Sequence, residues 1–155
     1  MQRRARSLPY RALASLVWMA LFGAIHASAE PSFKDVAAIR SLMSATWDKP
    51  DAKLVVEPVV VRADYAVASW VQGNRGGRAL LRKNEGVWIV VLCSGDPLKD
   101  ASALAAAGVP ADVAAHLARE LAAAERQLPA AHTALFSTFD GVVEMDQHHG
   151  HVGHH

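Results

Sequence analysis

The sequence contains one cysteine, Cys93, so no disulfide can form within the chain. It also lacks a nucleophile elbow and a His-Glu-x-x-His motif. Its glycine-rich run, residues 73–77, precedes a predicted strand, whereas phosphate-binding loops precede a helix. We therefore expect a protein that is stabilised by packing and is not an enzyme.

No apolar run is long enough to cross a membrane as a helix. The longest, residues 12–25, has 14 residues, and a spanning helix needs about 20. Four arginines precede it without any acid, and a small-x-small triplet ending at Ala29 follows it. These are the three parts of a secretory signal peptide. We predict cleavage after Ala29 and a periplasmic location, with an uncleaved anchor as the alternative.

Positive charge is scarce after that cleavage. The chain has 16 basic and 15 acidic residues, and four of the basic ones lie in residues 1–29. The remaining 12 basic residues give a formal charge of −3. Nucleic-acid binders concentrate positive charge, so we expect no nucleic-acid partner. Residues 30–155 suffice for one domain.

A helix is predicted between Ser32, which can cap it, and Pro50, which ends it. Its apolar residues recur at helical spacing at Val36, Ile39, Met43 and Trp47. We interpret Met43 as a core residue, because methionine commonly fills irregular space in cores.

Apolar alternation and turn residues then predict an antiparallel meander. The predicted strands are residues 54–61, 65–72, 78–83 and 87–93. Pro58 cannot donate to a ladder, so the first of these belongs at an edge or a bulge. The last is apolar on both faces and should be central.

Further helices are predicted after the sheet, beginning at Asp96-Pro97, at Pro110 and at Pro129. We expect the last two to dock as a helical hairpin. The fold class is therefore α+β, with a helix on an antiparallel sheet that is cystatin-like or nuclear-transport-factor-like by analogy. The predicted organisation is a signal peptide over residues 1–29, one domain over 30–141 and a flexible tail over 142–155.

The strongest chemical signal is the C-terminus. Five of its last eight residues are histidines, namely His148, His149, His151, His154 and His155. A short His-rich tract is typical of metal binding, and imidazole suits copper, zinc and nickel alike. Met145, just before the tract, offers a thioether for Cu(I). We predict copper as the ion, with zinc or nickel as alternatives.

The sequence allows two interpretations of Cys93. It is either a small buried apolar residue or a thiolate stabilised beside the helix start at Asp96, able to bind a soft metal. We retain it as a secondary metal ligand. Arg75 and Arg78 make the preceding turn basic. We interpret them as a solvated charge cluster, with contact to an anion or a partner as the alternative.

The chain resembles a family of small exported bacterial proteins described as copper-uptake-system-associated. The resemblance rests on residues 43–51, on 65–68 with Trp70, on 75–81 and 91–96, and on the His-rich end. It implies association with a copper transport or uptake component in the periplasm, and it carries over no catalytic residue. The positions to which it draws attention are Cys93 and the terminal histidines.

A competing hypothesis gives the folded domain the activity and makes the tail incidental. A small ligand would then bind between the first helix and the sheet, against Trp47, Tyr65, Trp70 or Trp88. A third hypothesis is an interaction module for a membrane transporter.

Overall fold

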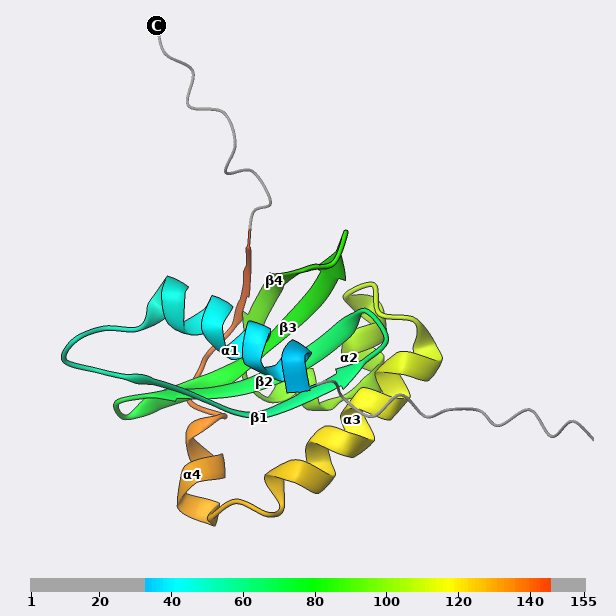
Figure 1. Ribbon diagram of the computed structural model, residues 1–155. Coiled ribbons are helices and arrows are strands. Elements are labelled where there is room, and N and C mark those ends of the chain that lie inside the picture. Colours follow the sequence, from blue (N-terminus) through cyan, green and yellow to red (C-terminus); the bar gives the residue numbers. More distant parts are fainter. Residues whose placement is uncertain (1–32, 146–155) are drawn as a thin grey trace, which may run out of the picture.

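The computed structural model describes residues 33–145 and has an α+β fold, as predicted. The predicted signal peptide and the five C-terminal histidines lie outside the described residues. In chain order the elements are α1 (Phe33–Trp47), β1 (Leu54–Arg62), β2 (Tyr65–Gln72), β3 (Arg75–Asn84), β4 (Val87–Ser94), the 3-10 helix η1 (Asp96–Lys99), α2 (Ala101–Ala106), α3 (Ala111–Glu125), α4 (Ala130–Leu135) and β5 (Val142–Glu144). Figure 1 shows α1 laid across the sheet.

The sheet is an antiparallel meander in the order β1-β2-β3-β4-β5. Two-residue turns join β1 to β2, β2 to β3 and β3 to β4. At the last of these, Glu85 and Gly86 both have positive φ, as the turns that suit twisted hairpins require. The pairing of β1 shifts between Val56 and Val59, around Pro58. The predicted edge position and irregularity of this strand are confirmed.

Two apolar clusters lie on opposite faces of the sheet. On one face, Ile39 and Met43 of α1 are buried against Ala66, Ala68 and Leu81. On the other face, α2 and α3 bury Leu104, Leu117 and Leu121 against Val67 and Leu80. Successive side chains of a strand point to opposite faces of the sheet, so apolar strands contribute to a hydrophobic core on each face.

The C-terminal part differs from the prediction in two respects. α2 and α3 form the helical pair on their face of the sheet, whereas α4 contacts β3 instead of forming the expected hairpin with α3. Val142–Glu144, expected to begin a flexible tail, pair with β4 as a fifth strand. A hydrogen bond from the Met145 amide to the Val91 carbonyl (2.9 Å) continues this pairing. β4 is therefore flanked on both sides, as predicted for a central strand.

Among residues 33–145, no helix has the length and apolar character that crossing a membrane would demand.

Candidate functional site

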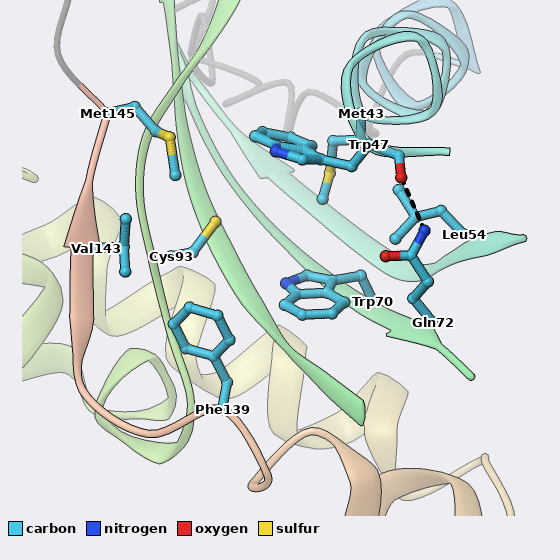
Figure 2. Close-up of a pocket in the computed structure, with 9 residues that line it drawn as sticks. All are labelled: Met43, Trp47, Leu54, Trp70, Gln72, Cys93, Phe139, Val143 and Met145. Carbon is cyan, nitrogen blue, oxygen red and sulfur yellow. Dashed lines mark hydrogen bonds between the residues drawn. The ribbon is translucent and has the colours of Figure 1, made fainter. Parts of the chain in front are cut away.

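A cavity of about 280 Å³ lies between the C-terminal end of α1 and the face of the sheet that α1 covers, and β5 borders it on one side. The cavity is partly open to solvent. Its walls come from segments far apart in the sequence (Figure 2). The lining residues are Met43, Trp47, Leu54, Trp70, Gln72, Cys93, Phe139, Val143 and Met145. The site is therefore assembled by the tertiary fold.

Gln72 lines the cavity and connects neighbouring segments through its side-chain amide. Its amide nitrogen donates hydrogen bonds to the carbonyls of Trp47 (2.7 Å) and Ala52 (2.8 Å). These bonds tie the end of α1 and the following loop to β2. The same loop is held by Asp48, which accepts hydrogen bonds from the Leu54 amide (2.8 Å) and the Lys53 ammonium group (2.9 Å). Both bonds to Asp48 lower the pKa of its carboxyl group.

Two aromatic side chains that line the cavity pack against each other next to a glycine of β3. Trp70 and Phe139 meet edge to face, with ring centroids 5.7 Å apart. A Cβ atom at Gly77 would lie 2.9 Å from the Phe139 Cβ and 3.1 Å from the Trp70 ring. Glycine is therefore the residue that lets this pair pack on β3.

β5 places two more side chains on the cavity wall. Cys93 of β4 pairs with Val143, and the Ser94 hydroxyl donates to the Gly141 carbonyl (2.9 Å), which fixes the chain where it turns into β5. Met145 follows this strand and its side chain extends toward Cys93 (Figure 2). The structure thus brings together two residues that the sequence suggested separately as metal ligands.

Cys93 is a buried thiol, 6% exposed. Burial raises the pKa of this thiol to about 11, because a thiolate loses its hydration there. The predicted burial of Cys93 is confirmed. Its role as a ligand for a soft metal stays a prediction.

We expect Cys93 to react slowly with a disulfide reagent at pH 8. With a pKa of about 11, about one thiol in a thousand is ionised at that pH, so reaction should be about 200-fold slower than for an ordinary cysteine. The measurement is the rate of thiol modification in native buffer and in denaturant. A native rate equal to the denatured rate would contradict the burial of this side chain.

Met43 is the cavity residue whose role the sequence did not suggest. It belongs to the core, as predicted, and is 1% exposed, but its side chain also lines the cavity. The sequence spacing could have indicated this position, because Met43 lies one helical turn before Trp47 and therefore on the same helix face. Phe139 and Gln72 carried no comparable signal.

Of the four aromatic residues suggested as lining a ligand pocket, two line the cavity and two lie elsewhere. Trp47 and Trp70 line the cavity, as the small-ligand hypothesis expected. Trp88 instead donates its ring N–H to Asp35 (2.9 Å), and the Tyr65 hydroxyl donates to the Gly108 carbonyl (3.3 Å) on the α2 side. Lys83 also pairs with Asp35 (2.6 Å), and this pair and the indole lower the pKa of the Asp35 carboxyl group.

Arg78 is not part of a solvated basic turn. It is 2% exposed and forms a two-pronged ion pair with Glu125 of α3. Arg75 is exposed, as expected. Arg78 therefore has a structural role, joining β3 to α3.

Within residues 33–145, no three histidine, cysteine, aspartate or glutamate side chains come together as a metal site. The sulfur atoms of the cavity are the remaining soft donors in this part of the chain. Comparison of the chain with protein-family models, with curated proteins and with solved structures found no match.

Proposed function

We propose that this protein is an exported copper-binding accessory protein, which captures copper through its C-terminal histidines and passes it to a transport or uptake partner. The observation that supports this proposal is the convergence of Cys93 and Met145 on one cavity. In the sequence, His148 follows three residues after Met145, which lines the cavity.

Two classes of copper ligand therefore follow one another along the chain. Imidazoles suit Cu(II) and also accept Cu(I), whereas thiolate and thioether sulfur favour Cu(I). A histidine-rich sequence that follows a sulfur-lined cavity wall along the chain is suited to taking up an ion and passing it to sulfur ligands or to a partner.

The test is a Cu(II) titration of residues 30–155 beside a chain that ends at Gln147. We expect the shorter chain to lose most of its Cu(II) affinity. Affinity of the longer chain should fall from pH 7 to pH 5, because free imidazoles protonate near pH 6.5 and then cannot bind metal. Isothermal titration calorimetry measures both effects.

A full-length variant with all five tail histidines replaced by asparagine controls for the loss of chain length. Val152→Ala, in the same segment, is the matched control and should leave the affinity unchanged. Equal Cu(II) affinity in the native chain and the asparagine variant would contradict the role of the histidines.

A second candidate function is the binding of a small apolar molecule, and the cavity volume favours it. About 280 Å³ is near the lower end of the range for small-molecule sites, about 300–1,000 Å³. Met43→Leu separates this candidate from metal binding by the cavity sulfur atoms, because leucine keeps the apolar volume and removes only the sulfur. An apolar probe whose affinity survives this change would favour the second candidate.

A further inference from the structure

Three sulfur atoms from distant parts of the chain point into the cavity. Met43 belongs to α1, Cys93 to β4, and Met145 directly follows β5 (Figure 2). Thioether and thiolate sulfur are soft donors that select Cu(I) among the common biological metals. Methionine has three flexible side-chain bonds, so both thioethers can adjust to an ion.

The charge of the lining residues restricts which ion this space can hold. Among the described residues, the cavity is lined by no carboxylate and no imidazole, and Cys93 is the one side chain that can become an anion there. A thiolate with a monovalent cation is neutral, whereas a divalent cation would leave one uncompensated positive charge. Burial of an uncompensated charge is costly, so these walls disfavour Zn²⁺ and Cu²⁺.

Trp70 supplies a second, independent observation. Its ring nitrogen is buried and has no hydrogen-bond partner within residues 33–145. Figure 2 shows this nitrogen on the side of the indole that faces Cys93. An unpaired buried donor is unfavourable, and a neutral thiol is a weak acceptor. A metal-bound thiolate is a much better acceptor, and hydrogen bonds to ligating sulfur tune metal sites.

We propose that the cavity binds one soft monovalent ion, Cu(I) or Ag(I), through the sulfur atoms of Cys93, Met43 and Met145, with the Trp70 N–H directed at the thiolate. Binding replaces the S–H bond of Cys93 with a sulfur–metal bond and releases the proton to solvent. The oxidation state of the metal does not change. This inference rests on the proposed function only in naming copper as the natural ion.

The test uses residues 30–155 with the five tail histidines replaced by asparagine, so that the tail cannot contribute imidazole ligands. Cu(I), kept reduced, is titrated against a coloured Cu(I) chelator. We expect one ion to bind per chain. Cys93→Ser should weaken binding by at least about 100-fold, and Met43→Leu and Met145→Leu by about 10-fold to 100-fold each, since even outer-shell changes reach that scale.

Val142→Ala is the matched control, because it truncates an apolar side chain of β5 that does not line the cavity. Val142 is 57% exposed, and its replacement should change the affinity by no more than about threefold, the scale of a surface substitution. Trp70→Phe should weaken binding by about 10-fold, as loss of an outer-shell hydrogen bond does. Circular dichroism of each variant checks that the fold is retained.

Copper X-ray absorption of the loaded protein should show a sulfur shell. Absence of Cu(I) binding by the asparagine variant, affinity unchanged by Cys93→Ser, or equal affinity for Zn²⁺ would each overturn the cavity site. None of these results bears on the tail, whose role is decided by the Cu(II) titration of the native chain. The two proposals can therefore fail separately.

Discussion

Arg78→Met should lower the free energy of unfolding by about 3–5 kcal/mol, the usual cost of removing one partner from a buried ion pair. The Arg78 Nε and Nη2 atoms each donate to a carboxylate oxygen of Glu125 at 2.8 Å, and Ser69 donates to the same carboxylate at 2.9 Å. The Glu125 side chain is 11% exposed. Without the guanidinium group, a nearly buried carboxylate loses its countercharge. Urea denaturation measures the difference.

The double variant Arg78→Met, Glu125→Leu separates the ion pair from the packing. Replacing both charges with apolar groups of similar size is often neutral or stabilising, so we expect the double variant to recover much of the lost stability. If the double variant were less stable than Arg78→Met by a further 3 kcal/mol or so, the packing of the side chains would dominate and the ion-pair argument would fail.

The same network indicates a pH dependence of stability. Hydrogen bonds from Ser137 and Lys99, with Arg78 nearby, lower the pKa of the Asp96 carboxyl group below its ordinary value. A lowered carboxyl pKa stabilises the fold above the pKa of the unfolded chain, and this contribution is lost as the pH falls through the folded pKa. Asp96 is about half exposed, so screening by solvent reduces its contribution to the free energy of unfolding.

The sequence was sufficient to predict the elements whose periodicity is strong. α1 and the first four strands follow from one apolar helix face and from alternation. The bulge follows from Pro58, which lacks an amide hydrogen. The burial of Arg78 was not predictable in this way, because residues 73–78 are rich in turn residues, although β3 already begins at Arg75.

β5 shows a different limit of prediction. Three residues, Val142–Glu144, are too few to display alternation, and the segment forms a strand because β4 offers an edge in register with it. The cavity depends on that register. Cys93 and Met145 were both named from the sequence, but their meeting follows from pairing between strands about fifty residues apart.

Phe136→Ala should also lower the free energy of unfolding by about 3–5 kcal/mol, the range for truncating a buried phenylalanine. Phe136 follows α4 and is 0% exposed. Its ring lies edge to face with His132, at a centroid distance of 5.3 Å, and under the Arg78 guanidinium group at 5.4 Å. Alanine would leave a cavity at this junction. Phe136→Leu is the matched control and should cost less.

Arg78 and Phe136 should not act independently. Besides contacting the ring, Arg78 Nη1 donates to the Phe136 carbonyl (3.4 Å) and to the Gly95 carbonyl (3.2 Å). Groups that share contacts usually show coupling of about 0.5–3 kcal/mol, so Arg78→Met combined with Phe136→Ala should cost less than the two losses added together. Strict additivity in a double-mutant cycle would contradict this coupling.

Phe139 lies three residues beyond Phe136 and lines the cavity, so the packing around Phe136 also sets the path of the chain into β5. We therefore expect Phe136→Ala, but not Phe136→Leu, to weaken ion binding in the cavity as well.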